Sequence, residues 1–518
     1  MDTAEEQRRA RLVIASNRGP VERRTGPDGE VVRHRGAGGL IAVLGPALAS
    51  HGGVWVASAL TEEDRAAARE AEGSAPDVLV LPEGPIGVRL LAHDPEAYAG
   101  YYGAVSTELL WFLQHHLREP GTPRTADADL HAQWGHYRTV NDAFARACAA
   151  EAQPGGTVLL QDYHLSLAPR RLRALRPDVR SAHFTMTPWA EPEQFAALPA
   201  ELRRELVDGL LGADMVCFLV PRWADAFLAC CAELGLAVDR TARSVRDAGG
   251  RAVAVRCFPV GVDETALRAR AAEPDVQRYE ADLRALAGDA RLVVRVDRME
   301  PSKNIVRGLD AYARFLQAHP ERHGRVVHYV LAYASRGELE AYREYAARVE
   351  TLTREINRTF GTDGWQPVVL ETRNDFGRGL AAMALADVLV VNPLRDGMNL
   401  VAKEGAVVGR RGPALVLSRH AGAADDLAEG CTLVDPWDPG ELAEAIEASL
   451  RLPHAERALR LGRLRRGAAA LPPDRWLAAA LTELERVAPE GAAGAPGGPE
   501  APGGSGGPVR PDDRCPPE

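Results

Sequence analysis

Two cations five positions apart form the strongest candidate for an anion site in this sequence. Arg298 and Lys303 follow the apolar run Leu292–Val296 and precede the amphipathic stretch Ile305–Leu316. A helix beginning directly after them would add its free N-terminal amides and the positive end of its dipole to the two charges. The segment is therefore suited to a diphosphate, although an ordinary charged surface loop would show the same pattern.

Lysine is rare in this chain, and one lysine lies in that segment. Lys and Arg together number 62, and the only lysines are Lys303 and Lys403, which leaves 60 arginines. A lysine retained in such a composition indicates a place that needs a compact ammonium rather than a planar guanidinium.

Carboxylates follow two other apolar runs. Asp396 and Glu404 lie eight positions apart in PLRDGMNLVAKE, after the run Val388–Asn392, and Asp162 follows a similar run. Carboxylates accept hydrogen bonds from sugar and ribose hydroxyls. The alternatives are that Asp396 caps a helix, that Glu404 is solvated, and that Asp162 bonds to His164 in the core.

A glycine-rich segment lies near the N-terminus, at residues 36–40 (GAGGL), before a predicted helix over Leu40–Ser50. Glycines that open a helix let backbone amides approach a phosphate. A tight turn with no ligand would use the same residues.

Short apolar runs alternate with helix-like stretches such as Leu339–Arg358. Buried strands that alternate with helices predict parallel sheets covered on both faces, and two series of them predict an α/β fold with two Rossmann-like domains. The strand-like runs are Leu12–Ser16, Val54–Ala57, Val158–Gln161, Ala182–Thr185 and Met215–Leu219 in the first series, and Leu292–Val296, Val326–Ala332, Val368–Glu371, Val388–Asn392, Ala414–Ser418 and Thr432–Asp435 in the second.

Segments where Pro and Gly interrupt the regular elements predict the domain limits. A hinge is expected at Phe258–Val262, which places the N-terminal domain at 1–258 and the C-terminal domain at 259–472. The amphipathic run in 473–488 predicts a final helix that can pack back on the N-terminal domain. Residues 489–518 are rich in Gly and Pro, which predicts a disordered tail.

Composition argues against several classes of partner. The net charge is −10 and no basic stripe is present, so no nucleic acid is expected, and no apolar run is long enough to imply a membrane. The N-terminus lacks a small-residue cleavage site, and the seven cysteines show neither metal-ligand nor disulfide spacing, so we expect a cytoplasmic protein. The sequence does not decide the oligomeric state, and a homo-oligomer stays open.

Seven segments in order give the chain a specific resemblance: ASNRGP, GAGGL, YYGAVSTELLW, LLQDYHL, VRVDRMEPSKN, ASRGE and PLRDGMNLVAKE. The chain resembles the trehalose-6-phosphate synthases from about Arg11 to Val487. The resemblance implies a GT-B fold, with two Rossmann-like domains facing a cleft. It also implies retaining transfer of glucose from UDP- or GDP-glucose to glucose-6-phosphate, giving α,α-trehalose 6-phosphate.

The resemblance also implies roles for individual residues. Arg298, Lys303 and Asp396 would be catalytic, with the two cations stabilising the leaving diphosphate in place of a metal, and no cofactor is expected. The acceptor would be bound by Arg18, Tyr102, Trp111, Asp162 and Arg336. The donor would be bound by Gly39, Arg298, Lys303, Phe376, Asp396, Met398, Asn399, Leu400, Val401 and Glu404.

One position departs from the family pattern. Met186 stands in HFTMTPWA where the family has a histidine at the donor sugar, and a thioether donates no hydrogen bond. His183 lies three residues earlier, on the other face of a strand. Three hypotheses follow: a slower synthase, a changed donor or acceptor such as glycerol-3-phosphate or a cyclitol phosphate, and a non-catalytic binder of sugar phosphates.

Overall fold

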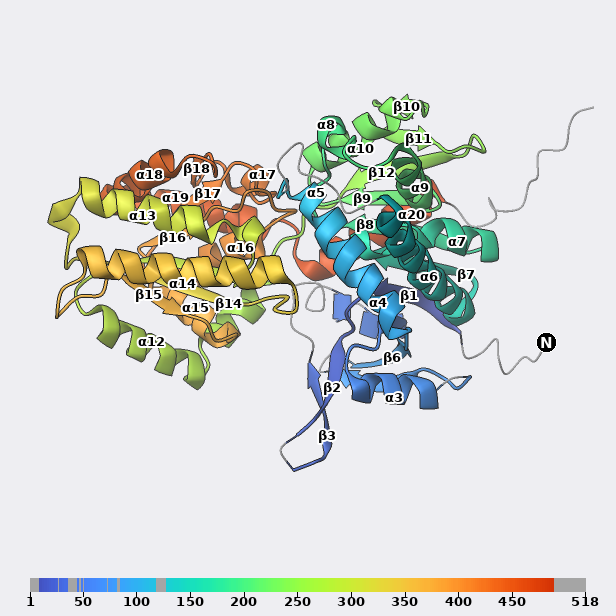
Figure 1. Ribbon diagram of the computed structural model, residues 1–518, viewed down its shortest axis with the longest axis horizontal. Helices are drawn as coiled ribbons and strands as arrows, with labels where there is room; N and C mark the ends of the chain where they lie inside the picture. The colour runs from blue at the N-terminus through green and yellow to red at the C-terminus, as the bar shows by residue number, and fades with distance from the viewer. Residues whose placement is uncertain are drawn as a thin grey trace, which may run out of the picture.

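Two lobes lie side by side in the computed structural model (Figure 1). The structure describes residues 9–26, 28–35, 44–45, 48–49, 51–71, 73–81, 84–117 and 127–488. The N-terminal lobe is built on a ten-stranded sheet and the C-terminal lobe on a six-stranded sheet. The predicted tail 489–518 and the segment 36–40 lie outside the described residues.

The N-terminal sheet is parallel at its centre and antiparallel at both ends. All five runs predicted in the first series form strands of this sheet, and their side chains are almost entirely buried. Its strands, in spatial order, are β10(Val238–Asp239), β11(Ser244–Arg246), β12(Ala252–Cys257), β9(Met215–Phe218), β8(Arg180–Thr185), β7(Ala152–Gln161), β1(Ala10–Ser16), β4(Val54–Ser58), β6(Gly84–Leu91) and β5(Asp77–Leu81). A separate hairpin joins β2(Val21–Thr25) to β3(Val31–Arg35).

The C-terminal sheet is parallel throughout, and the six runs of the second series form its strands. Their order is β15(Val368–Glu371), β14(Val326–Ala334), β13(Arg291–Met299), β16(Val388–Val391), β17(Ala414–Ser418) and β18(Thr432–Val434). Strand β13 is longer than predicted, because its pairing with β14 continues as far as Met299 and Ala334. Arg298 therefore lies at the end of a strand, not in the loop that the sequence predicted.

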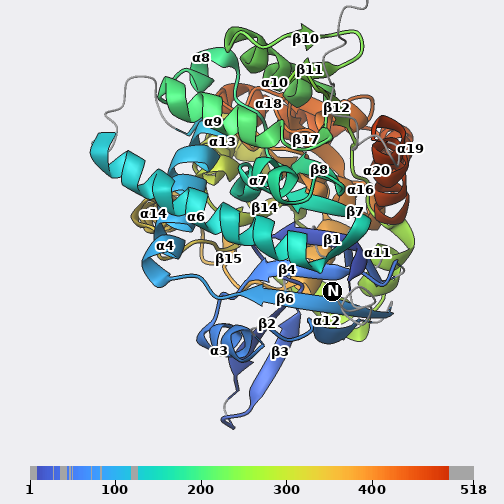
Figure 2. The same cartoon turned by 90° about the vertical axis from the view of Figure 1, so that its right-hand side faces the viewer.

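Helices cover the sheets, and Figure 2 shows α6 and α7 crossing in front of the N-terminal sheet. In the N-terminal lobe they are α3(Glu62–Glu70), α4(Pro95–Ala99), α5(Phe112–Gln114), α6(Asp127–Glu151), α7(Ala168–Leu175), α8(Pro192–Phe195), α9(Ala200–Leu210) and α10(Pro221–Glu233). In the remaining chain they are α11(Glu264–Ala271), α12(Pro274–Ala287), α13(Ile305–Ala318), α14(Glu340–Phe360), α15(Phe376–Leu385), α16(Leu400–Val408), α17(Ala424–Leu427), α18(Pro439–Arg451), α19(His454–Ala468) and α20(Pro473–Val487).

The last helix contacts the N-terminal lobe. Trp476 of α20 is fully buried, and its indole N–H donates to the carbonyl of Phe258 at 2.7 Å. The guanidinium of Arg256, at the end of β12, lies 2.5 Å from the carboxylate of Glu483. The amide of Gly261 donates to the carbonyl of Leu471 at 2.6 Å, so the connection between the lobes also packs against the residues just before α20.

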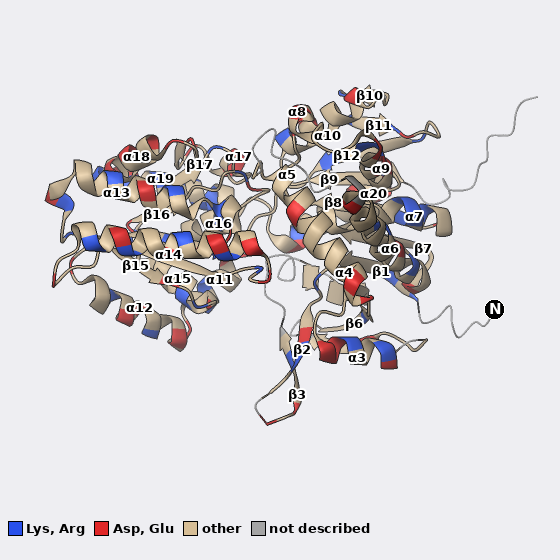
Figure 3. Cartoon of the chain, viewed as in Figure 1, with Lys and Arg blue, Asp and Glu red and all other residues tan. Residues whose placement is uncertain are grey.

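Charges of both signs are spread over the helices of both lobes, as Figure 3 shows. No helix among the described residues is long and apolar enough to cross a membrane.

Candidate functional site

Two arginines from different lobes face the hydroxyl of one tyrosine. Arg18 follows β1, Arg336 follows β14, and the charges of both act on the hydroxyl of Tyr102. Burial raises the pKa of the Tyr102 hydroxyl, but the facing guanidinium groups of Arg336 and Arg18 outweigh it, so the pKa lies below its usual value. Both cations thus favour negative charge at this point, which is what a phosphate monoester carries.

Contacts on three sides hold Arg336 in place. Its guanidinium donates to the hydroxyls of Tyr342 at 2.7 Å and Tyr163 at 3.0 Å, and it lies over the Trp111 ring at 4.6 Å. Its backbone is left-handed, with φ at +48°, a conformation that persists in a side-chain-bearing residue only where the surroundings fix it. The loop after β14 is therefore shaped to present this side chain to the other lobe.

Tyr102 and Trp111 belong to a π-helix, Gly100–Trp111, that the sequence did not indicate. Its hydrogen bonds include one from Phe112 N to the carbonyl of Thr107, five residues back. Nine residues turn an α-helix by about 900°, which would place the two rings on opposite faces. A π-helix has about 4.4 residues per turn, so nine residues complete about two turns and both rings share one face.

Asp162 is held from both sides at the end of β7. Its Oδ1 accepts hydrogen bonds from the amides of Tyr163 at 3.0 Å and Met186 at 3.2 Å, and its own amide donates to Phe184. Its φ is +69°. Burial raises the pKa of this carboxyl to about 6, despite the two amides and the charge of Arg336. Its Oδ2 accepts no hydrogen bond within the described residues and is free for a ligand hydroxyl.

The two candidate diphosphate ligands each lie near a carboxylate. Nζ of Lys303 lies 2.5 Å from Oδ2 of Asp396, and Nη2 of Arg298 lies 2.9 Å from Oε1 of the buried Glu300. Arg298 also lies over the Trp111 ring at 5.7 Å, on the ring that Arg336 contacts. Trp111 therefore contacts both Arg336, an acceptor-side candidate, and Arg298, a donor-side candidate.

The segment before α16 combines a strained residue with free amides. Asn399 has φ at +79°, its Oδ1 caps the amide of Ala402 at 3.2 Å, and its Nδ2 donates to Asp396 at 3.1 Å. The amides of Leu400 and Val401 begin the helix and have no intrahelical partner. Met398 is buried beside them. This arrangement orients Asp396 and offers amides for a ligand's oxygens.

The remaining donor-side candidates are Glu404, Phe376 and Gly39. Glu404 lies one turn into α16, and burial raises the pKa of its carboxyl to about 7. Phe376 begins α15 and is 52% exposed, and within the described residues its side chain makes no hydrogen bond or ring contact with the other candidates. Gly39 lies outside the described residues.

Met186 lies at the boundary between the lobes. It is half-buried, and a Cβ on Gly397 would lie 1.8 Å from the Met186 carbonyl oxygen, so the two backbones touch. His183 is fully buried, and its Nε2 lies 3.1 Å from the carbonyl of Asp162. That histidine supports the Asp162 backbone and does not take the place of position 186.

Comparison with known proteins gives the same picture. The family model for glycosyltransferase family 20 matches residues 10–486. The chain belongs to glycosyltransferase family 20. A trehalose-6-phosphate synthase of Mycobacterium avium is 36% identical over 491 residues, which cover 92% of this chain and 96% of that relative, and one of Mycobacterium tuberculosis is 34% identical over 500 residues, covering 93% and 95%.

Solved structures of this family superpose on most of the chain. An E. coli structure, described as trehalose-6-phosphate bound with UDP-2-fluoro glucose, has a TM-score of 0.78 and 26% identity, covering 92% of this chain and 99% of that one. A UDP-forming α,α-trehalose-phosphate synthase of Burkholderia xenovorans in complex with glucose-6-phosphate has a TM-score of 0.77 and 25% identity, with the same coverage. The GT-B fold is therefore confirmed, and this family 20 member is a glycosyltransferase.

Several residues near the site gave no clear signal in the sequence. Tyr163 follows Asp162 directly and Arg395 precedes Asp396, so both could have been included by adjacency. Glu300, two positions after Arg298 in VRVDRMEPSKN, could also have been included, whereas Tyr342 and His115 could not. His115 stacks on Trp111 with ring centroids 3.8 Å apart, and its Nδ1 lies 2.9 Å from the Trp111 carbonyl oxygen, so it fixes the ring from one side.

The two lysines have different roles in this family 20 chain. Lys403 is 1% exposed, and its ammonium donates to the carbonyl of Val260 at 2.7 Å and to Asp426 at 2.5 Å. It anchors the connection between the lobes to the C-terminal lobe, whereas Lys303 faces the candidate donor site.

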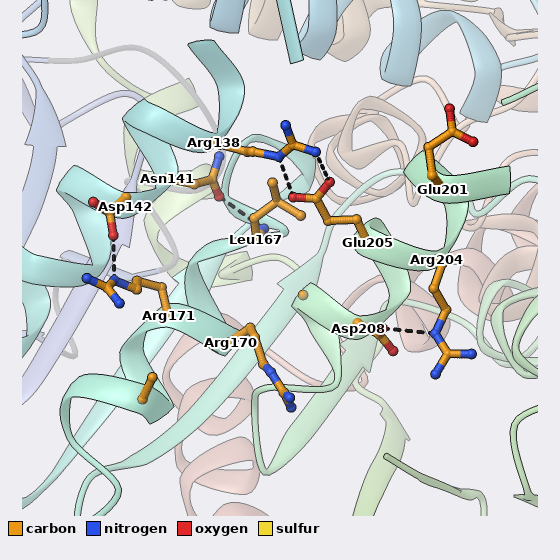
Figure 4. A pocket seen from close by; sticks show the side chains of 12 residues that line it. Arg138, Asn141, Asp142, Leu167, Arg170, Arg171, Glu201, Arg204, Glu205 and Asp208 are labelled. Carbon is orange, nitrogen blue, oxygen red and sulfur yellow. Dashed lines mark hydrogen bonds and ion pairs between the residues drawn. The ribbon is translucent and has the colours of Figure 1, made fainter. Parts of the chain in front are cut away.

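A surface hollow of about 630 Å³ on the N-terminal lobe contains none of the candidate residues (Figure 4). It lies between α6, α7 and α9, and most of its charges are paired with each other. Arg138 lies 2.6 Å from Glu205, Arg171 lies 2.6 Å from Asp142, and a third pair joins two residues of α9. Since its lining is largely self-compensated, the hollow does not compete with the boundary between the lobes as a substrate site.

One group of side chains among the described residues has the spacing of metal ligands: His319, Glu321 and Glu447. Glu447 already accepts hydrogen bonds from Arg322 at 2.7 and 2.9 Å and pairs with Arg451 at 2.5 Å. Two guanidinium groups on one carboxylate oppose a cation there. The six described cysteines are free thiols.

Proposed function

We propose that this chain transfers glucose from UDP- or GDP-glucose to glucose-6-phosphate with retention, forming α,α-trehalose 6-phosphate. The observation that carries the proposal is that two groups of arginine and lysine side chains both contact the ring of Trp111. The charges of Arg18 and Arg336 both act on the Tyr102 hydroxyl, Arg298 and Lys303 form a second group, and Trp111 contacts one arginine of each group.

The acceptor is a phosphorylated hexose in this proposal. Arg18 and Arg336 bind its phosphate, Tyr102 and Trp111 wall the sugar, and Asp162 accepts a hydrogen bond from a hydroxyl through Oδ2. Two aromatic residues on one face of the π-helix leave a space suited to a ring rather than to glycerol. The Burkholderia relative that holds glucose-6-phosphate supports this choice.

On the donor side, charge stabilisation drives the reaction. Negative charge grows on the leaving diphosphate as the acceptor hydroxyl approaches the same face of the sugar, and Arg298 and Lys303 lie where they can neutralise it. Asp396 and the first amides of α16 hold the glucose hydroxyls, and Glu404 accepts from the ribose. These cations supply the charge that a metal would supply, so the proposal includes neither a metal nor another cofactor. A cytoplasmic location is part of it, supported by the free thiols.

A donor panel tests the reaction. The purified chain is incubated with UDP-glucose or GDP-glucose and glucose-6-phosphate, with and without a chelator, and the product is analysed by NMR for the α,α linkage. We expect trehalose 6-phosphate in both chelator conditions. Absence of a disaccharide phosphate with every donor would overturn the proposal, and a product from glycerol-3-phosphate or a cyclitol phosphate in competition would change the acceptor.

Met186 supports a second candidate, a binder of sugar nucleotides with little or no turnover. Its backbone touches Gly397, next to Asp396, and its thioether side chain has no group that can donate a hydrogen bond. Donor binding by calorimetry with no product from any acceptor would favour this candidate.

A further inference from the structure

The residues on both sides of Asp396 are bound by the N-terminal lobe. Arg395 is 3% exposed, and its two Nη atoms donate to the two oxygens of the Glu191 carboxylate at 2.7 Å each. The carbonyl of Gly397 accepts from the indole N–H of Trp223 at 3.2 Å. Glu191 and Trp223 come from the loop after β8 and from α10, so one lobe holds the backbone that carries a side chain of the other.

Two guanidinium groups lie near the ring of Trp223 at this boundary. Arg395 lies 4.6 Å and Arg222 4.8 Å from its ring centroid. Arg222, its neighbour in α10, reaches across to the C-terminal lobe, where it donates to the carbonyl of Arg419 at 2.7 Å and pairs with Asp425 at 3.1 Å. Indole faces attract cations, so the buried ring of Trp223 contacts both arginines that bond from one lobe to the other.

The backbones at this boundary leave no space for adjustment. A Cβ on Gly397 would lie 1.8 Å from the Met186 carbonyl oxygen, and one on Gly422 would lie 1.9 Å from the Gly397 carbonyl oxygen. Three backbone segments from the two lobes are therefore in direct contact. If the lobes separate, the contact between the Gly397 backbone and the Met186 carbonyl must break.

Among the described residues, the side chain of Asp396, by contrast, bonds only within the C-terminal lobe, to Lys303 at 2.5 Å and Asn399 at 3.1 Å. Its backbone amide donates to the carbonyl of His420 at 3.2 Å. The carboxylate thus depends on one lobe for its partners and on the other lobe for the position of its flanking residues.

We propose that Glu191 and Trp223 are positioning residues that make the donor-glucose site depend on contact between the lobes. When the lobes meet, they fix Arg395 and Gly397, and this fixes Asp396 for the glucose hydroxyls. The inference rests on the proposed function. It predicts different effects on the two parts of the donor. In the proposed function the nucleoside diphosphate contacts Arg298, Lys303 and Glu404, and neither Glu191 nor Trp223 touches these residues.

The test compares binding of UDP with UDP-glucose, and of GDP with GDP-glucose, in Glu191→Gln and Trp223→Phe. The first substitution weakens the charge-assisted pair, and the second keeps the aromatic ring and removes the N–H. We expect nucleoside diphosphate affinity to stay within about twofold, while the gain in affinity from the glucose and the value of kcat each fall by about tenfold.

Asp225→Asn is the matched control. Asp225 lies in α10 two residues after Trp223, and it forms an ion pair with Arg243 of the same lobe at 2.8 Å. It also exchanges a carboxylate for an amide, and we expect it to leave both quantities unchanged. Variants that keep the full glucose gain, or that lose nucleotide and glucose binding equally, would overturn the inference.

A ligand-free measurement keeps the inference separate from the proposed function. Small-angle scattering should show a larger radius of gyration for Glu191→Gln and Trp223→Phe than for wild type or Asp225→Asn. If the wild type forms no product but the variants expand and lose the glucose gain, the reaction is wrong and the inference stands. If no variant expands and the glucose gain persists, the inference is wrong whatever the reaction.

Discussion

Nζ of Lys303 and Oδ2 of Asp396 lie 2.5 Å apart, so the candidate ligand of the diphosphate also orients the candidate ligand of the donor sugar. Burial alone would raise the pKa of Asp396 and lower that of Lys303. The opposite charges outweigh it, so Lys303 holds the pKa of Asp396 below its usual value and Asp396, with Asp297, holds the pKa of Lys303 above its own. Both groups therefore stay charged across the physiological range. Removing either one leaves a poorly solvated charge without its partner.

Arg298→Ala and Lys303→Ala should each lower kcat by about 100- to 1,000-fold, because each removes a preorganised charge from the leaving diphosphate. Lys303→Ala should also weaken binding of the donor glucose, since Asp396 loses the ammonium that orients it. Steady-state kinetics with the donor varied measures both effects. Arg314→Ala is a suitable control, because Arg314 is an exposed residue of α13 paired with Asp310. A loss below tenfold for both variants would contradict the assignment.

Arg336→Lys should raise KM for the phosphorylated acceptor by about 10- to 100-fold, with a smaller effect on the donor. A lysine cannot donate to the Tyr163 and Tyr342 hydroxyls while it stacks on Trp111, as the planar guanidinium does. Arg354→Lys is the control, because it makes the same substitution at an exposed position of α14 away from the site. Equal KM values for the two variants would exclude Arg336 from the acceptor site.

The strands and the order of the motifs were predictable, because each strand is a local apolar run that alternates with a helix. The limits of β13 were not, because its pairing with β14 extends the strand through Arg298, which lies opposite Tyr333. The common face of Tyr102 and Trp111 was not predictable either, since it depends on π-helical hydrogen bonds that have no simple sequence pattern.

Residues that act across the lobe boundary were the hardest to find. Trp223 contacts Gly397 although 174 positions separate them, and no feature of the α10 sequence marks this contact. Lys403 shows a second limit, since it lies inside a recognisable motif but its ammonium binds Val260 and Asp426 away from the candidate donor residues. Proximity to a motif therefore locates the segment but not the direction of each side chain.

Donor affinity should fall as the pH drops from about 8 to about 6, because burial raises the pKa of Glu404 to about 7 and only the ionised carboxyl is a full acceptor for ribose hydroxyls. The donor diphosphate keeps its charge over this range, whereas the acceptor phosphate titrates near pH 6, so donor binding without acceptor gives the clean measurement. Glu404→Gln should flatten the profile. An unchanged slope in that variant would assign the titration to another group.

The same shift predicts a change in stability. The native state keeps the Glu404 proton that the unfolded chain has already released above its ordinary pKa of 4.5. The free energy of unfolding should therefore decrease as the pH rises from about 4.5 to about 7, and Glu404→Gln should remove this part of the decrease. Urea unfolding at several pH values measures it, and a wild-type slope retained in the variant would contradict the prediction.

Met186→His should raise kcat by about 10- to 150-fold if the missing hydrogen bond to the donor sugar limits the rate, since such a bond is worth about 1–3 kcal/mol. The backbone is already fixed for the new ring: the Met186 amide donates to Asp162 at 3.2 Å, and its carbonyl oxygen lies against Gly397. Met186→Leu, which adds no polar atom, should leave kcat near the wild-type value. A wild type that is already fast, with no gain from the histidine, would show that this chain positions the donor sugar by other groups, and Asp396 with the first amides of α16 would then be sufficient.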